Sequence, residues 1–134
     1  MPTDWSNATA PSLADFEALA QTAWNRLPAE FRGLAGDLVI RIEDFATDEI
    51  LDDMDIEDPF ELTGIYQGVS LDRKSLNDTT REPDIVFLYR RAILDEWASD
   101  DEELGHLVAN VLIHEIGHHF GFSDDDMEAI EARI

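Results

Sequence analysis

The pattern of hydrophobic and polar positions divides the chain into helical and extended segments. The first helical segment follows Ser12, and Asp15 lies three residues later, as in a capping box. Its apolar residues recur at helical spacing and are Leu13, Phe16, Leu19, Ala20, Ala23 and Trp24. This spacing predicts an amphipathic helix that ends by Pro28, followed by a short helical turn over residues 29–34.

Three later segments have the β-branched content or the alternation that is typical of strands. They cover residues 38–42, 62–71 and 84–89. Gly64 and Gly68 in the second segment indicate a bulge or a close backbone approach. The acidic stretch over residues 47–61 predicts a short exposed helix and a loop, and its spacing is not that of a calcium-binding loop. Residues 72–83 are polar without periodicity and predict a longer loop.

Helical patterns return in the last third of the chain. A short helix is predicted over residues 90–98, and a capping box at residues 99–102 predicts the start of a long helix. Apolar residues cover most of that helix, so we expect it to run through the middle of the fold as far as Gly121. A last helix over residues 124–134 is capped by Ser123.

Composition and charge narrow the possible partners. The chain has 134 residues, 44% of them hydrophobic, and we expect one domain over residues 1–134. Its 9 Lys and Arg residues against 31 Asp and Glu residues give a formal net charge of −22. A field of this sign repels nucleic acids and anionic membranes, so we expect neither as a partner. The sequence shows no secretory signal or membrane-spanning apolar run, which predicts a cytoplasmic protein, and it leaves the oligomeric state open.

The segment His114-Glu115-Ile116-Gly117-His118 on the predicted long helix carries the candidate chemistry. Helical residues advance by about 100°, so the two histidines lie about 40° apart on one face and can bind one ion. Because the chain has no cysteine, any further protein ligand is a histidine or a carboxylate. Glu115 is close enough to act as general base on a metal-bound water, the geometry of metal-assisted hydrolysis.

A third ligand has to come from beyond this helix. Gly121 tolerates the left-handed conformation that turns the chain back sharply, and Asp124 follows three residues later. We therefore predict one zinc ion bound by His114, His118 and Asp124. Asp124 also suits the first turn of the last helix, where an acid stabilises the helix dipole. Three other acids can substitute as the ligand, namely Asp125, Asp126 and Glu128.

Four further side chains near the motif have weaker assignments. His119 lies about 100° around the helix from His118, so we expect it outside the ligand set, as a hydrogen-bonded histidine either in the core or behind the metal ligands. His106 lies on the more polar side of the helix and is expected in solvent. Tyr66 and Tyr89 are candidates to stabilise an oxyanion, although strand-borne tyrosines more often belong to the core or its rim.

The run from His114 to Asp124 is similar to the extended zincin signature His-Glu-x-x-His-x-x-Gly-x-x-His/Asp in its aspartate form. The doubled histidine, the Phe-Gly-x-Ser-Asp tail, residues 64–69 and the strand over residues 85–89 resemble the minimal zincin-like metallopeptidase family of short bacterial proteins. The resemblance spans about residues 38–127. It implies an α+β fold in which a small mixed β-sheet packs against a long active-site helix with flanking helices.

The same resemblance implies zinc ligands at His114, His118 and Asp124 and a catalytic glutamate at Glu115. In larger zincins an edge strand above the site binds the substrate as an added antiparallel strand, and the segment 62–71 is the candidate for that role. The chain departs from the metzincin pattern, because the only later methionine, Met127, falls inside a predicted helix.

These observations support a zinc-dependent hydrolase that acts on a peptide or protein substrate. Two alternatives belong to other functional classes. The first is a non-catalytic, zinc-stabilised binding or regulatory module with an acidic surface, which the small size of the chain favours. The second is an acidic mimic that blocks a basic protein, suggested by the net charge alone.

Overall fold

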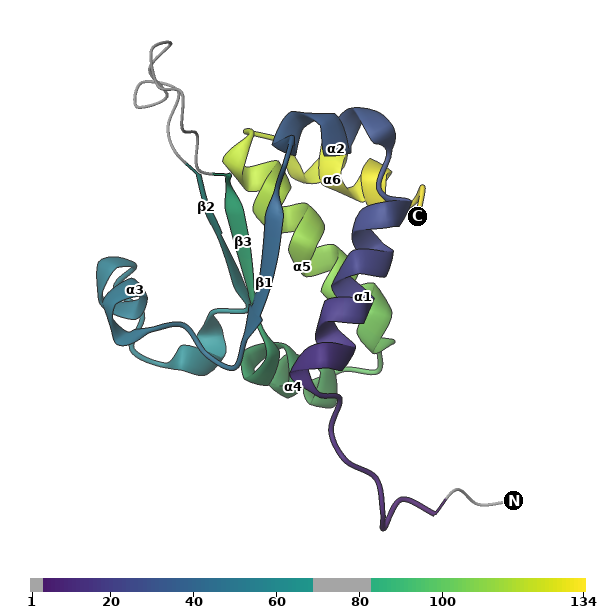
Figure 1. Cartoon of the computed structure of the whole chain (residues 1–134), viewed down its shortest axis with the longest axis vertical. Coiled ribbons are helices and arrows are strands. Elements are labelled where there is room, and N and C mark those ends of the chain that lie inside the picture. Colours follow the sequence, from purple (N-terminus) through teal and green to yellow (C-terminus); the bar gives the residue numbers. More distant parts are fainter. Residues whose placement is uncertain (1–3, 69–82) are drawn as a thin grey trace.

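Helices and a three-stranded sheet make up the part of the chain that the computed structural model describes, residues 4–68 and 83–134. In chain order the elements are α1 (Leu13–Arg26), α2 (Ala29–Ala35), β1 (Val39–Glu43), α3 (Asp48–Asp53), the 3-10 helix η1 (Pro59–Glu61), β2 (Gly64–Gln67), β3 (Ile85–Tyr89), α4 (Arg90–Ser99), α5 (Leu104–His119) and α6 (Asp124–Glu131). This is the predicted α+β class, with helices around a small sheet (Figure 1).

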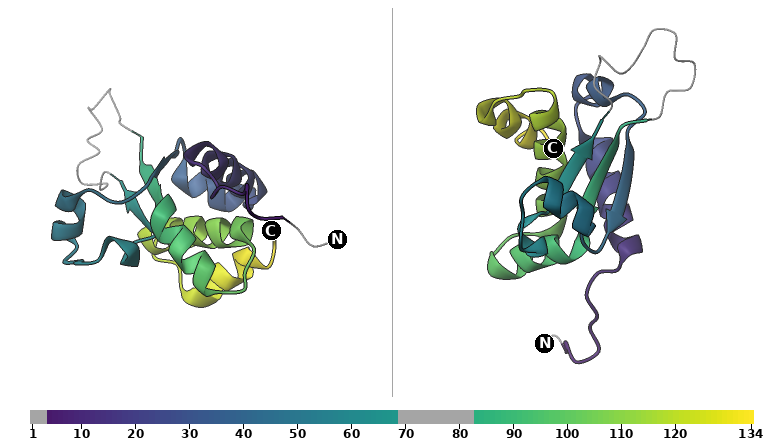
Figure 2. Two further views of the ribbon diagram at one scale, coloured as in Figure 1. Left: turned by 90° about the horizontal axis from the view of Figure 1, so that it is seen from below. Right: turned by 90° about the vertical axis from the view of Figure 1, so that its left-hand side faces the viewer.

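The sheet has the strand order β1-β3-β2, so that β3 is central and β2 forms one edge. β1 pairs with β3 in parallel, with Val39 opposite Ile85, whereas β2 pairs with β3 antiparallel, with Gly64 opposite Leu88. The sheet is therefore mixed, as predicted. Helices α1 and α5 lie side by side on one face of the sheet, and α3 lies on the other side (Figure 1, Figure 2).

The central strand contributes to two hydrophobic clusters. Val86 and Leu88 are fully buried in the larger cluster, which α1 and α5 complete. The smaller cluster lies on the other face and contains Ala46, Leu51, Leu62, Tyr89 and Ala92. Because consecutive strand residues point to opposite faces, this arrangement buries β3 on both sides.

Helix α5 runs through the middle of the fold, as its apolar circumference predicts. It packs against α1, β2, β3, α4 and α6, and most of its turns contribute to the core. Its buried residues are Leu107, Val108, Ala109, Val111, Leu112, Ile113, Ile116 and Gly117. No helix in residues 4–68 or 83–134 is both long and apolar enough to cross a membrane.

The predicted start of this helix at Ser99 is wrong. Ser99 is the last residue of α4, and its hydroxyl donates a hydrogen bond to the Asp95 carbonyl oxygen, 3.0 Å away. Helix α5 begins only at Leu104, with Glu103 as an N-cap whose side chain makes no capping bond. The intervening turn is tied to α4 by the Trp97 indole N–H, which donates to the Glu102 carbonyl oxygen at 2.7 Å.

Other boundaries differ by smaller amounts. The predicted strand 62–71 begins at Gly64 because Leu62 closes the 3-10 helix, and residues 69–71 lie outside the described residues, as do residues 72–82 of the predicted loop. The acidic stretch forms a short helix and a loop, as expected. The last helix has the predicted capping box, and it ends at Glu131 rather than at residue 134.

Packing between α5 and α6 depends on a glycine in the histidine motif. A Cβ atom built on Gly117 would lie 2.6 Å from Sδ of Met127, so only a glycine leaves room for this methionine. Met127 is 0% exposed. The contact fixes α6, with its acidic residues, against the C-terminal half of α5.

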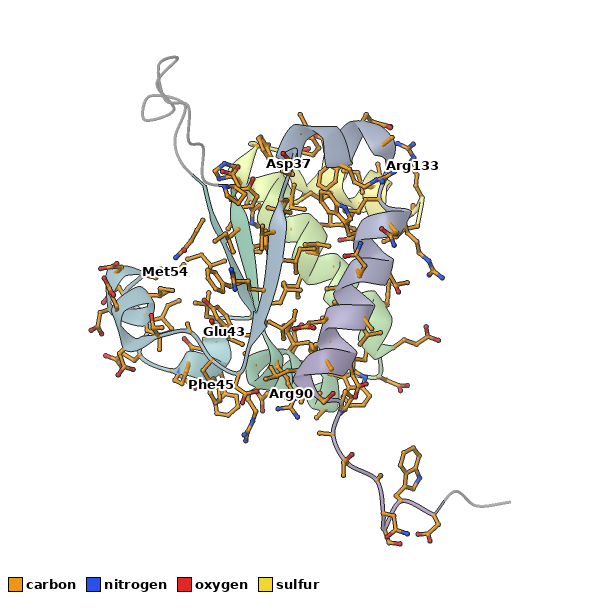
Figure 3. All side chains as sticks on the ribbon, in the orientation of Figure 1. Asp37, Glu43, Phe45, Met54, Arg90 and Arg133 are labelled. Carbon is orange, nitrogen blue, oxygen red and sulfur yellow. The ribbon has the colours of Figure 1, made fainter. Side chains whose placement is uncertain are left out.

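We therefore expect Met127→Ala to lower the free energy of unfolding by about 2–5 kcal/mol, the range for large-to-small changes in a core. Met54 is the matched control, because it lies at the end of α3 with 43% of its surface exposed (Figure 3). Met54→Ala should change the unfolding free energy by less than about 0.5 kcal/mol. Urea unfolding followed by circular dichroism measures both values, and equal effects would contradict the packing described.

Candidate metal centre

His114 and His118 lie one turn apart on α5, as the motif spacing predicts. Their ring centroids are 5.6 Å apart and the ring planes are inclined by 71°. His118 is exposed and the His114 side chain is 41% exposed, so solvent reaches both rings. The two side chains thus form an accessible pair on one helix face.

An acid that the sequence analysis did not identify contacts this pair. Glu131, the last residue of α6, has its Oε1 2.9 Å from Nε2 of His114. Two ligands on one tetrahedral zinc, at about 2.0–2.1 Å from the ion, are about 3.3 Å apart. The 2.9 Å between Glu131 and His114 is a hydrogen-bond distance, shorter than this ligand spacing, so the two groups would move apart to share an ion. The signal for Glu131 in the sequence is its position four residues after the apolar Met127, one turn along the same side of α6.

The predicted turn after the motif is present. Gly121 has a φ of +76°, in the left-handed region that favours glycine, and the chain reverses there into α6. Asp124 is the first residue of α6 and is exposed. Among residues 4–68 and 83–134, no three His, Cys, Asp or Glu side chains are already placed together around one metal position. Asp124 as third ligand therefore stays a prediction.

The alternative ligands differ in their present bonds. Asp126 completes the capping box of α6, because its Oδ2 accepts a hydrogen bond from the Ser123 backbone N–H at 3.2 Å. Asp125 and Glu128 are exposed on the same helix. A ligand role for Asp126 would thus cost the helix part of its cap.

Glu115 lies between α5 and the edge strand β2. A Cβ atom on Gly64 would be 3.3 Å from Cγ of Glu115 and 3.0 Å from the Phe87 carbonyl oxygen, so strand and helix approach closely here. Burial raises the pKa of Glu115 to about 7, and the backbone N–H of Tyr66 opposes this increase by favouring the ionised form. A carboxyl with this pKa exchanges protons readily at neutral pH, as a general base must.

Within residues 4–68 and 83–134, no strand pairs with the outer edge of β2, and this free edge faces the same region. The Tyr89 backbone N–H donates to the Thr63 carbonyl oxygen at 2.9 Å, which makes Thr63 and Tyr89 a hydrogen-bonded pair of the antiparallel ladder. In such a ladder the bonding direction alternates, so the backbone groups of Gly64 and Tyr66 point away from β3. These groups are directed toward the free edge of the sheet beside Glu115.

Neither predicted tyrosine offers an accessible hydroxyl to the site: the Tyr66 hydroxyl is already hydrogen-bonded, and the Tyr89 hydroxyl is buried with no hydrogen-bond partner among the described residues. The Tyr66 hydroxyl donates to Oδ2 of Asp84 at 2.6 Å, and its ring stacks on His119 with centroids 3.8 Å apart. Tyr89 is fully buried in the smaller cluster, where burial, Glu43 and Glu115 raise its pKa to about 12. His119 is exposed rather than in the core, so its stacking on Tyr66 corrects the expectation of a core histidine.

A comparison with protein families agrees with this geometry. The sequence profile of the zincin-like metallopeptidases matches residues 35–134. The chain belongs to this family. No curated protein matches the chain. Membership of this family implies, in general terms, a zinc-dependent function of the peptidase type. It also implies that peptides are the class of substrate.

The residues present fit a zinc ion. Two imidazoles one turn apart, with carboxylates of α6 beside them, are the donor types that zinc prefers in the absence of cysteine. His114 and His118 would supply the imidazole ligands, and a carboxylate would supply the third. If Nε2 of His114 is the ligand atom, zinc binding replaces its contact with Glu131 or draws that carboxylate onto the ion.

The raised pKa of Glu115 gives a prediction for the metal-free zincin-like domain. Its pKa rises from 4.5 to about 7 on folding, so the folded state favours the neutral form. Ionisation then costs stability as the pH rises from 4.5 through about 7. In EDTA, Glu115→Gln should be more stable than the wild type by roughly 1–3 kcal/mol at pH 8.

This difference should fall to about 0.4 kcal/mol at pH 4.5, where Glu115 is neutral in the folded state and half ionised in the unfolded state. Chemical unfolding of both proteins at pH 4.5, 6 and 8 measures it. A stability difference that did not change with pH would show that Glu115 does not titrate as its burial requires.

Proposed function

We propose that this protein is a zinc-dependent peptidase in which Glu115 is the general base. The observation that carries the proposal is the position of Glu115, a half-buried carboxyl with a pKa of about 7 that lies against β2 and next to His114 in the histidine motif. When bound, the zinc ion supplies a water of lowered pKa and polarises the substrate carbonyl. Glu115 takes the proton of that water and returns it to the leaving amine.

The proposed ligands of a single zinc ion are His114, His118 and Asp124. The left-handed turn at Gly121 and the return of α6 onto α5 support Asp124, because they bring the start of α6 back beside the histidine helix. Glu131 is the competing candidate, because its carboxylate already contacts His114.

The substrate is a peptide or protein segment that adds to the edge of β2. The outward-facing backbone groups of Gly64 can pair directly with an extended chain. The Tyr66 N–H can do so once it exchanges its bond to the Glu115 carboxylate, which would place a peptide bond alongside Glu115. Strand addition requires only main-chain groups, so it suits a small domain that has few walls for side-chain subsites.

The second candidate function is a zinc-stabilised module without catalysis. The contact between Glu131 and His114 favours it, because zinc bound by Asp124 and Glu131 together with both histidines has four protein ligands and no open position. The number of protein ligands therefore separates the two functions.

We expect one zinc ion per chain after purification without chelator. Asp124→Asn should weaken zinc binding by about 10–100-fold or more, whereas Glu131→Gln should bind zinc nearly as well as the wild type. Elemental analysis and competition with a chromogenic chelator measure both. Metal loss in Glu131→Gln with normal binding in Asp124→Asn would make Glu131 the third ligand, and loss in both variants would support the closed site.

Catalysis is tested separately from metal binding. Glu115→Gln should keep the zinc content of the wild type and lose activity by about 10²–10⁴-fold, because it removes the base and leaves the ligands. Hydrolysis of a mixture of unfolded peptides, followed by mass spectrometry, measures this with zinc-loaded enzyme. Equal hydrolysis by the wild type and the variant would exclude Glu115 as the base.

A further inference from the structure

A cavity of about 290 Å³ extends from the candidate catalytic residues toward α4. The side of α5 that precedes His114 and Glu115 forms one wall, and Thr63 lies at its edge just before β2. The lining residues are Thr63, Glu96, Glu102, Leu107, Asn110, Val111, His114 and Glu115. The cavity is thus continuous with the site at which Glu115 acts.

Two acids and an amide make one part of this cavity strongly negative. Glu96 and Glu102 both line it, and neither pairs with a Lys or Arg side chain within residues 4–68 and 83–134. Glu102 has a histidine partner, His106, whose Nδ1 lies 3.5 Å from Oε1 of Glu102 and whose side chain is 56% exposed. Burial and the nearby charges of Glu102 and Asp100 raise the pKa of Glu96, as expected for uncompensated negative charge.

Asn110 supplies an unpaired acceptor in the same place. Its amide nitrogen donates to Oε1 of Glu102 at 3.4 Å, so the amide oxygen of Asn110 points away from Glu102. That oxygen, Oδ1, is buried and has no hydrogen-bond partner among the described residues. A buried acceptor without a donor costs free energy unless a ligand or water supplies one. The cavity therefore has two carboxylates without a Lys or Arg partner in the described part of the chain and, next to them, a buried carbonyl oxygen without a donor there.

The shape and chemistry of this cavity fit a long cationic side chain. Leu107 and Val111 provide apolar wall for a methylene stem, while Glu96, Glu102 and Asn110 provide acceptors for a charged head. Asn110 precedes Glu115 by five residues, about 7.5 Å along the helix axis, a span suited to the four-carbon stem of lysine or to arginine.

We propose that this cavity binds a Lys or Arg side chain of the substrate, on the C-terminal side of the cleaved bond. β2 begins next to Thr63, which lines the cavity, and runs toward His119. A Cβ built on Gly68, just after the end of β2, would contact the His119 ring. A peptide added antiparallel to β2 runs the opposite way, so the residues after the cleaved bond lie over the cavity. This specificity rests on the proposed peptidase function, and it extends that function by naming the substrate class.

The test compares peptides that differ at the first residue after the cleaved bond, with Lys, Arg, norleucine or Glu at that position. Zinc-loaded wild type should cleave the Lys and Arg peptides with a kcat/KM at least about tenfold above that for norleucine. The double variant Glu96→Gln/Glu102→Gln should lose most of this preference. The control Glu49→Gln/Glu57→Gln changes the net charge equally at two exposed acids outside the cavity and should keep it.

A binding measurement separates this proposal from the proposed function. Calorimetry with zinc-loaded Glu115→Gln, which should not turn over, compares the Lys peptide with its norleucine analogue, alone and in combination with the cavity variants. A Lys preference that depends on Glu96 and Glu102 supports the cavity even if the wild type cleaves nothing, an outcome that would reject the peptidase function alone. Equal binding of the two peptides, or a preference that persists in the double variant, overturns the cavity assignment.

Discussion

The close approach between α5 and the edge strand β2 is the constraint on which the site depends. It favours a glycine at position 64, because a Cβ there would lie 3.0 Å from the Phe87 carbonyl oxygen and 3.1 Å from a methyl group of Val111, both tight contacts. The same approach buries Glu115 and raises its pKa to about 7. It also sets the free edge of the sheet beside that carboxyl. Base, helix and docking edge are therefore parts of one packing arrangement.

A second close approach, between Gly117 and Met127, attaches α6 to the other side of the histidine motif. The two glycines thus act on opposite sides of one helix. Gly64 admits the strand that faces Glu115, and Gly117 admits the helix that carries the acidic residues. Glu131 of α6 contacts His114, and Asp124 stands at the start of the same helix, so whether one or both of them bind would decide between an open, catalytic zinc and a closed, structural one.

The acidic residues that give the chain its net charge of −22 occupy two kinds of position in this structure. Most acids of the described residues lie on exposed helices and loops, where their charge faces solvent. Glu96 and Glu102 are different, because they line a cavity that joins the candidate site and have no Lys or Arg partner within the described part of the chain. The overall field would attract both a divalent cation and a basic peptide, while these two side chains would select among the peptides.

Features that depend on neighbouring residues were predictable from the sequence. The pairing of His114 with His118 follows from helix geometry, the caps at Ser12 and Ser123 from side-chain bonds three residues away, and the turn at Gly121 from glycine's conformational freedom. The start of α5 was not predictable in this way. The cap at Ser99 has the right local pattern, yet α4 continues through it and uses its hydroxyl.

Contacts between distant segments were decided only by the tertiary structure. Glu131 reaches His114 across 17 residues because Met127 fixes the rotation of α6, and Tyr66 meets Asp84 because β2 and β3 pair in one register. The cavity with Glu96 and Glu102 exists because α4 packs beside α5. Local bonding determines which residues can share a helix face, whereas the packing of whole elements determines which faces meet.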